Sequence, residues 1–200
     1  MKGNVLGDIR AEQDKNMLDT AFWESADYKS LLESYDRPII VGRRGTGKSA
    51  LAYRLSKHWS SKSKTLVLTI SPEEEQVIGL RDIFDQFGEK YLHIKAGTKM
   101  AWRYAIYMEI IVEIGNHYKY KNNLDIHQVR EHYTSWGTKR QSISTKIRRK
   151  LKSVLNDSES PQSRIADLSD NLELELIEEV LFEALEKSDV QCVVFADRLD

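Results

Sequence analysis

The sequence predicts an α/β fold in which a parallel sheet carries a large helical insertion. Three short apolar runs indicate buried strands at 38–41, 64–70 and 190–196. A glycine-rich loop and a helical pattern follow the first run, and only helical patterns fill the roughly 110 residues between the second and the third. Strands that alternate with helices pair in parallel, because each helix carries the chain back across the sheet.

Composition and charge limit the class of protein. The 200 residues are 40% apolar and 30% charged, which suits one soluble globular domain. The formal charge of −1 gives no general attraction to nucleic acid or anionic lipid, so any such contact needs a local patch. Cys192 is the single cysteine, which excludes an intrachain disulfide framework. The N-terminus has no signal-peptide pattern, and the most apolar stretch, 100–115, is charged and short, so we expect a cytoplasmic protein without a membrane segment.

The first part of the chain divides into a helical lead-in at 1–36 and the start of the core at 37–75. Pro38 favours an extended backbone at the residue before it, so we expect the lead-in helix to stop there and a strand to begin. A helix should follow the glycine-rich loop, with its apolar residues every fourth position from Leu51. Another helix should begin at Ser71, which is followed by proline at the first helical position.

The middle of the chain, residues 76–189, is predicted to be the helical insertion. A polar loop is expected at 156–163, where serine, asparagine and proline gather. The expected helices run from about 98 to 118, from 123 toward 133, over 141–155 and onward from 170. Residues 190–200 form the last strand and its end, and we expect the rest of the core to be missing from this chain.

The loop between the first strand and its helix has the pattern of a phosphate-binding loop. Residues 42–49 read GRRGTGKS, which fits G-x-x-x-x-G-K-[ST] in a strand, loop and helix context. Glycines let the backbone turn its N–H groups inward, and the helix offers its positive end to an anion. The predicted nucleotide-binding residues are Gly42, Arg43, Arg44, Gly45, Thr46, Gly47, Lys48, Ser49 and Ala50.

Three residues receive the central roles in this chemistry. Lys48 would bridge the β- and γ-phosphates of the nucleotide, and Ser49 would give its hydroxyl to Mg²⁺. The apolar strand VVFA delivers Asp197 at its end, where a carboxylate can hold the hydrated metal. The predicted ligands are therefore ATP and Mg²⁺, with Ser49 and Asp197 on the metal.

Charged residues near these positions have two interpretations each. Asp200 is a candidate for orienting or deprotonating the attacking water, or else a carboxylate that caps the next turn. Arg198 could contact a neighbouring subunit's nucleotide or remain a solvated cation. Arg43 and Arg44 either add positive potential around a polyphosphate or fill variable loop positions.

A basic stretch from Lys139 to Lys152 lies on a predicted amphipathic helix, with no acidic residue between its ends. It could contact nucleic-acid phosphates. The alternative is a solvated face, or pairing with the acidic helix that follows residue 170. Trp23 is interpreted as a packing anchor, with a place in a base pocket as its alternative.

Two segments resemble a known group of proteins. IIVGRRGTGKSALAYRL, at 39–55, and VVFADRLD, at 193–200, are similar to P-loop ATPases of the STAND and KAP type, which are AAA-like NTPases. The resemblance implies a three-layer parallel sheet, ATP with Mg²⁺, and a helical insertion. Members act as oligomeric switches or motors, several in bacterial defence against phage and mobile elements. Many carry glutamate after the metal-binding aspartate, where this chain has Arg198.

From the motifs and the resemblance we expect a P-loop ATPase. It would bind Mg-ATP and hydrolyse it, with Lys48, Asp197 and Asp200 as the catalytic residues, to drive a conformational change in a larger, oligomeric assembly. The alternatives are a nucleotide-gated switch or scaffold without hydrolysis, and a DNA-stimulated ATPase.

Overall fold

The computed structural model describes residues 15–33, 39–43, 45–72, 76, 78–137, 141–156 and 158–197. Two strands lie in it, β1 (Thr65–Ile70) and β2 (Gln191–Ala196). The helices are α1 (Lys15–Ala21), α2 (Ala26–Glu33), α3 (Lys48–Ser60), α5 (Arg81–Phe84), η2 (Asp85–Phe87), α6 (Tyr91–Asn116), η3 (Lys121–Asn123), α7 (Arg130–Trp136), α8 (Ile143–Val154), α9 (Pro161–Asn171) and α10 (Leu174–Ser188).

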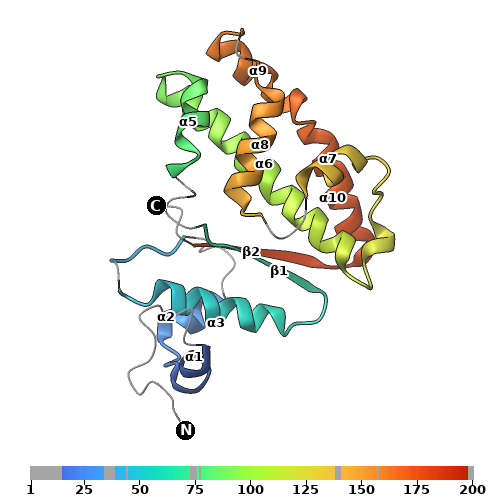
Figure 1. Ribbon diagram of the computed structural model, residues 1–200. Coiled ribbons are helices and arrows are strands. Elements are labelled where there is room, and N and C mark those ends of the chain that lie inside the picture. The colour runs from blue at the N-terminus through green and yellow to red at the C-terminus, as the bar shows by residue number, and fades with distance from the viewer. Residues whose placement is uncertain are drawn as a thin grey trace.

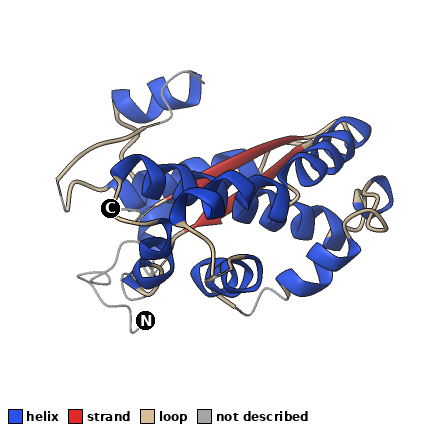
Figure 2. Ribbon diagram, turned by 90° about the horizontal axis from the view of Figure 1, so that it is seen from above, coloured by secondary structure: helices blue, strands red, loops and turns tan. Residues whose placement is uncertain are grey.

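The sheet confirms the parallel pairing expected for the second and third apolar runs. β1 and β2 are parallel neighbours, in a register that runs from Thr65 opposite Gln191 to Ile70 opposite Ala196. Figure 2 shows the two strands side by side, with helices around them. Between the strands the described chain is helical, so the observed class is a mostly helical α/β protein.

Helices cover both faces of this small sheet. Figure 1 shows α3 on one face and the group formed by α6, α8 and α10 on the other. Leu68 and Ile70 of β1 belong to the same buried cluster as the apolar residues of α6 and α10. The helical segment between the strands therefore packs directly on the sheet rather than forming a separate core.

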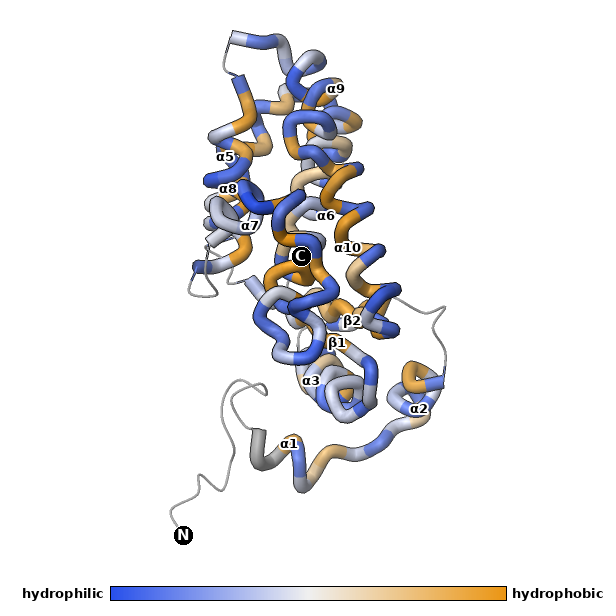
Figure 3. Tube along the Cα trace, turned by 90° about the vertical axis from the view of Figure 1, so that its right-hand side faces the viewer, coloured by the Kyte–Doolittle hydropathy of each residue, from blue (hydrophilic) through white to orange (hydrophobic). Residues whose placement is uncertain are grey.

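The longest helix, α6, is the centre of the helical group. Tyr104, Ala105, Met108, Ile111 and Ile114 of α6 are all at most 1% exposed. Figure 3 shows apolar positions recurring along α10, and apolar residues of α6 and α10 belong to one buried cluster. Burial of large side chains on this scale is the main term that stabilises the group.

The first predicted strand is not part of the described sheet. Residues 39–43 are assigned to no strand, and the sheet of the described residues consists of β1 and β2. Ile39 is 80% exposed and Val41 is 89% exposed, so their apolar side chains contact little of the described chain. The apolar run was predicted as a buried strand. A strand is buried only when it pairs with neighbouring strands, and the apolar composition of the run does not provide such neighbours. Pro38 lies outside the described residues.

The first long helix of the insertion begins earlier than expected. The helix was predicted from about residue 98, yet α6 begins at Tyr91 and includes Gly97. A Cβ atom at Gly97 would lie 2.4 Å from the ring of Phe87, so the glycine lets this ring pack against the helix. Packing of Phe87, which is fully buried, therefore outweighs the low helix propensity of glycine.

Two further boundaries differ for local reasons. The helix expected from residue 123 begins only at Arg130, because the Asp125 side chain accepts hydrogen bonds from His127 N and Gln128 Nε2 and so holds a turn. The loop expected at 156–163 contains the start of α9, where Ser160 accepts from Ser163 N and Pro161 takes the first helical position. Serine followed by proline is a helix-start signal, and here it outweighs the polar composition of the segment.

Other expectations have simpler outcomes. The helix over 141–155 is confirmed as α8, with Ile147 and Leu151 each 1% exposed. Ser71 and Pro72 are assigned to no helix, and residues 73–75, which the helix predicted from Ser71 would enter, lie outside the described residues, so this helix stays a prediction. In the described part of the chain no helix is long and apolar enough to cross a membrane.

Candidate nucleotide-phosphate site

The glycine-rich loop has the backbone that its pattern requires. Gly45 and Gly47 have φ angles of 86° and 85°, a left-handed conformation that side chains with a Cβ rarely adopt. Thr46 closes the turn, because its hydroxyl donates to the Arg43 carbonyl at 2.8 Å. A Cβ at Gly42 would lie 2.8 Å from that hydroxyl, so the first glycine of the pattern is needed for space.

Lys48 is the first residue of α3 and folds back over the loop. Its Nζ donates to the carbonyl of Gly42 at 2.6 Å and to that of Arg43 at 3.1 Å. The ammonium group therefore lies on the inside of the loop, where the phosphates of a nucleotide would lie. The N-terminus of the 13-residue α3 faces the same place, and its dipole favours an anion there.

The two predicted metal ligands meet although they are 148 residues apart. The Ser49 hydroxyl donates to Asp197 Oδ2 at 2.8 Å. Asp197 follows β2 directly, and its backbone N–H donates to the Ile70 carbonyl at 2.9 Å, which extends the β1–β2 pairing by one residue. The sheet thus fixes the position of the carboxylate, and α3 fixes the position of the hydroxyl.

The donor set suits Mg²⁺. This ion prefers oxygen ligands such as carboxylates and hydroxyls. The Ser49 hydroxyl and the Asp197 carboxylate are such groups, and their hydrogen bond of 2.8 Å places them together, so both could hold the ion. Among the described residues no group of three or more His, Cys, Asp or Glu side chains gathers as a metal cage. Two protein ligands are typical of Mg²⁺, which keeps waters and takes substrate phosphates.

Other predicted site residues have separate outcomes. Ala50 is half-buried in the first turn of α3. Arg43 is exposed on the loop, whereas Arg44 lies outside the described residues. Arg198 and Asp200 also lie outside them, so their roles stay predictions. Trp23 is 84% exposed, which contradicts its interpretation as a packing anchor.

The lead-in helices brace α3, a contact that the sequence did not reveal. Asp19 of α1 forms an ion pair with Lys57 at 2.6 Å, and Arg54 lies 3.5 Å from the same carboxylate. The hydrogen bond from Lys57 lowers the pKa of Asp19 below its ordinary value. The Arg54 guanidinium also lies 5.2 Å from the centre of the Phe22 ring. These contacts lie along the helix that carries Lys48.

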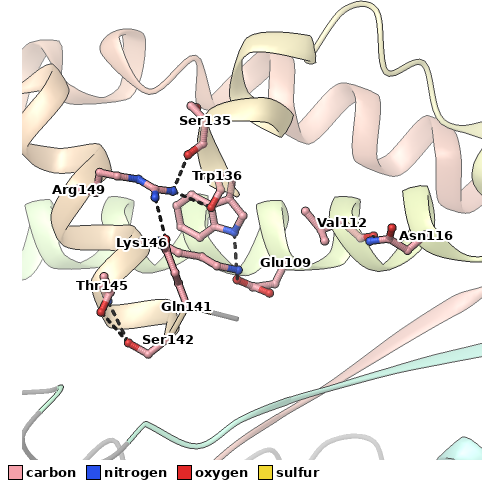
Figure 4. Close-up of polar contacts among 10 residues, drawn as sticks. All are labelled: Glu109, Val112, Asn116, Ser135, Trp136, Gln141, Ser142, Thr145, Lys146 and Arg149. Atoms are coloured by element: carbon pink, nitrogen blue, oxygen red, sulfur yellow. Dashed lines mark hydrogen bonds and ion pairs between the residues drawn. The ribbon is translucent and has the colours of Figure 1, made fainter. Parts of the chain in front are cut away.

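The basic stretch of α8 is largely committed to internal contacts. Lys146 is 1% exposed, and its Nζ donates to Glu109 Oε1 at 2.6 Å. The Trp136 indole N–H donates to the same oxygen at 3.0 Å, as Figure 4 shows. The basic stretch was expected to contact nucleic-acid phosphates, to face solvent or to pair with the acidic helix, but the partner of Lys146 is a glutamate of α6.

Two further cations of α8 hold neighbouring segments. The Arg149 guanidinium donates to the carbonyl of Trp136 at 2.7 Å and to Gln141 Oε1 at 2.7 Å. Lys150 is half-buried, its Nζ 5.4 Å from the centre of the Tyr104 ring, and burial lowers its pKa. Arg148 and Lys152 of α8 are exposed, and no ion pair among the described residues involves them. Two cations form only a small basic surface for contact with nucleic-acid phosphates.

Comparison with known proteins gives one informative match. No family model matches the chain, and no solved structure matches it. The chain is 41% identical over 200 residues to the "Putative transposon gamma-delta 80.3 kDa protein" of Escherichia coli (strain K12). The match covers all of this chain and 28% of that relative, so the chain spans about a quarter of the relative's length.

Proposed function

We propose that this chain binds Mg-ATP at the loop of residues 42–49 and hydrolyses it to drive a conformational change in a larger, oligomeric assembly. The observation that carries the proposal is the 2.8 Å contact between the Ser49 hydroxyl and Asp197. A glycine-rich loop alone is a common pattern, whereas a loop serine beside a carboxylate at the end of a buried strand is the arrangement that a Mg-nucleotide requires.

Each residue has a role that follows from its position. Lys48 exchanges its contacts with the loop carbonyls for the negatively charged phosphates, and the N-terminus of α3 adds its positive dipole. Mg²⁺, when bound, neutralises phosphate charge. Ser49 and Asp197 hold and orient it, and Asp200 is proposed to position the attacking water.

The finer features of the expected fold belong to the same proposal. A three-layer P-loop sheet would include residues 39–41 as a strand, which would bury Ile39 and Val41, now exposed. Residues 76–189 would be the insertion in that sheet. We place the protein in the cytoplasm, where ATP and Mg²⁺ are available.

The relative's name suggests what ATP hydrolysis could be used for. Its name attributes it to a transposon, which is mobile DNA. This supports an ATPase that acts with nucleic acid, and we propose stimulation of hydrolysis by DNA as the second candidate function. The part in antiviral defence that the P-loop resemblance implies stays a prediction.

A switch that binds nucleotide without hydrolysing it is the third candidate. Arg198 stands directly after Asp197, where many of the resembled ATPases have glutamate. Without a base at that position, the water would have to be activated by another carboxylate.

The test compares the protein with Lys48→Ala, using binding of fluorescent ATP and GTP analogues and phosphate release, each with Mg²⁺ and with EDTA. We expect Mg²⁺-dependent binding, and turnover at least a hundredfold lower in the variant, because a charge that stabilises the transition state is lost. Lys95→Ala, an exposed lysine of α6, is the matched control and should behave as the parent. Binding without turnover would support the switch, and no binding of either nucleotide would overturn the proposal.

A further inference from the structure

The turn that follows α6 presents a stack of aromatic rings. The rings of His117 and Tyr120 lie 4.2 Å apart between centroids, with an interplanar angle of 12°. The rings of His117 and Tyr118 lie 5.1 Å apart at 23°. Tyr118 is 74% exposed, so an aromatic ring at the end of this stack faces solvent. A large exposed aromatic side chain that packs on no core residue is a feature of binding surfaces.

The turn is held in place from several sides. The His117 carbonyl accepts hydrogen bonds from Tyr120 N at 3.2 Å and Lys121 N at 3.0 Å. The His117 ring accepts from Lys119 N at 3.3 Å through Nδ1. Tyr120 packs against the buried cluster, and Asn123 donates to Ser188 Oγ of α10 at 3.0 Å. The aromatic stack is therefore preformed, so a ligand would lose less conformational entropy from ordering this turn when it binds.

Two lysines, Lys119 and Lys121, lie close in sequence to the exposed Tyr118 ring. The Lys119 ammonium lies 5.4 Å from the centre of the Tyr118 ring, and a hydrogen bond with the Tyr118 hydroxyl raises the pKa of Lys119. Lys121 follows two residues later and is exposed. In the described residues no ion pair joins either lysine to a carboxylate. Both are available to an anionic ligand.

Two carboxylates near the turn form ion pairs with other lysines, and a third accepts hydrogen bonds from neutral groups. Asp189 forms an ion pair with Lys64, and Glu183 forms one with Lys187 at 2.6 Å. Asp125 accepts from the backbone of His127 and the side chain of Gln128. Asp189 and Glu183 are thus paired with other lysines, which leaves Lys119 and Lys121 free to contact an anionic ligand beside Tyr118.

A hollow of about 390 Å³ lies on the same side of the molecule. It is lined by His58, Trp59 and Lys62 at the end of α3, and by Thr65 and Gln191 at the starts of the two strands. Figure 1 shows the end of α6, the end of α3 and both strand starts on one side. The hollow repeats the combination of an aromatic ring with basic side chains.

We propose that the surface formed by His117, Tyr118, Lys119 and Lys121, with the hollow beside Trp59 and Lys62, binds single-stranded nucleic acid. Unpaired bases stack on exposed aromatic rings, and lysines between the rings contact the phosphates. In a duplex the bases are already stacked on each other, so a duplex gains little from Tyr118. The surface lies at the starts of the strands, whereas Asp197 follows the end of β2, so nucleotide and nucleic acid do not compete.

This proposal stands apart from the candidate ATPase activity, and its test needs no nucleotide. Binding of fluorescein-labelled dT20, rU20 and a 20-base-pair DNA duplex would be measured by anisotropy in 50 and 200 mM salt. We expect both single strands to bind more tightly than the duplex, with Tyr118→Ala weakening them about tenfold, since loss of one stacked base costs roughly that factor. Tyr118→Phe keeps the ring and should bind as the parent does.

The charge contribution has its own matched pair of variants. Lys119→Gln with Lys121→Gln should reduce the slope of binding against salt by roughly 1.4, because each phosphate contact on a single strand contributes about 0.7. Lys95→Gln with Lys99→Gln, which removes the same charge from the exposed face of α6, should leave the slope unchanged. The proposal is overturned if neither single strand binds at 50 mM salt, or if Tyr118→Ala binds as tightly as the parent. A duplex that binds better than both single strands also overturns it.

Discussion

The helical group around α6 and the loop at residues 42–49 satisfy their polar groups in opposite ways. In the helical group, Lys146 and Glu109 form a buried pair that also receives the Trp136 indole, and large apolar side chains surround it. In the loop, Lys48 and Thr46 donate to carbonyls of the loop itself, close to the surface. The buried pair in the helical group has no room to exchange partners, whereas the polar groups of the loop can exchange their partners for a ligand.

This difference separates stability from ligand response. A buried charge that loses its partner has no water to replace it, so the penalty falls on the folded state. A surface lysine that loses a carbonyl partner is solvated, so the penalty is small. We expect substitutions in the helical group to change the free energy of unfolding, and substitutions in the loop to change the response to nucleotide.

The largest effect on stability is expected for Lys146→Met. Methionine keeps most of the packing volume but leaves the Glu109 carboxylate, which is 15% exposed, without its cation. The loss should be about 3–5 kcal/mol in the free energy of unfolding, measured with urea. Glu109→Gln in the same background should recover part of it, and Lys152→Met on the exposed face of α8 should change little. A Lys146→Met protein as stable as the parent would refute the buried pair.

Gly97→Ala should have the next largest effect. The new Cβ would lie 2.4 Å from the Phe87 ring, so the ring or α6 must move. Overpacking of this kind costs about 1–3 kcal/mol, although alanine is the better helix former. The double variant with Phe87→Leu should be less sensitive to the added methyl group. An increase in stability for Gly97→Ala alone would mean that Phe87 does not pack there.

Gly47→Ala tests the loop side of the comparison. Gly47 has a φ of 85°, and no atom of the described residues lies within 4 Å of the added Cβ, so the cost is backbone strain of about 1 kcal/mol. Because the backbone N–H groups of the loop are displaced, we expect the thermal stabilisation by Mg-ATP to be lost. Gly97→Ala should retain that stabilisation. If Gly47→Ala lowers the free energy of unfolding as much as Lys146→Met does, the idea that the loop affects ligand response rather than stability is wrong.

The smallest effect is expected at the brace between α1 and α3. The pKa of Asp19 is lowered by Lys57, so its ionised form stabilises the folded state above the unfolded pKa of about 3.9. That contribution is lost as pH falls through the folded pKa. Asp19→Asn should therefore be slightly less stable than the parent at pH 7, and the gap in urea midpoint should narrow as the pH falls below the unfolded pKa. A gap that does not change with pH in this acidic range would assign the effect to something other than charge.

Local chemistry predicted much of the candidate site. The spacing of glycine, lysine and serine fixed where the loop lies and where α3 begins, because positive φ angles and a helix start are local properties. The strand that ends just before Asp197 was also predictable from the sequence, because a buried parallel strand is continuously apolar. The brace from Asp19 was not predictable, because a surface pair between distant helices has no sequence period.

Errors in the fold arose where a partner from elsewhere overrides a local preference. The helix predicted from about residue 98 begins at Tyr91, and Phe87 packs against it at Gly97. The basic run of α8 suggested a solvated surface, but Glu109 lies opposite Lys146. The apolar run at 39–41 suggested a buried strand, but no described strand pairs with it. Glu109 and Lys146 are 37 residues apart, so no local pattern shows that they pair.

The sequence by itself determined the kinds of element and the residues of the loop, because propensity, capping and glycine conformation act over a few residues. Only the tertiary structure decided that Ser49 and Asp197 touch, and that Lys146 is buried while Tyr118 is exposed. Contact and burial depend on which surfaces the fold brings together, and a residue's own neighbours in sequence do not specify them.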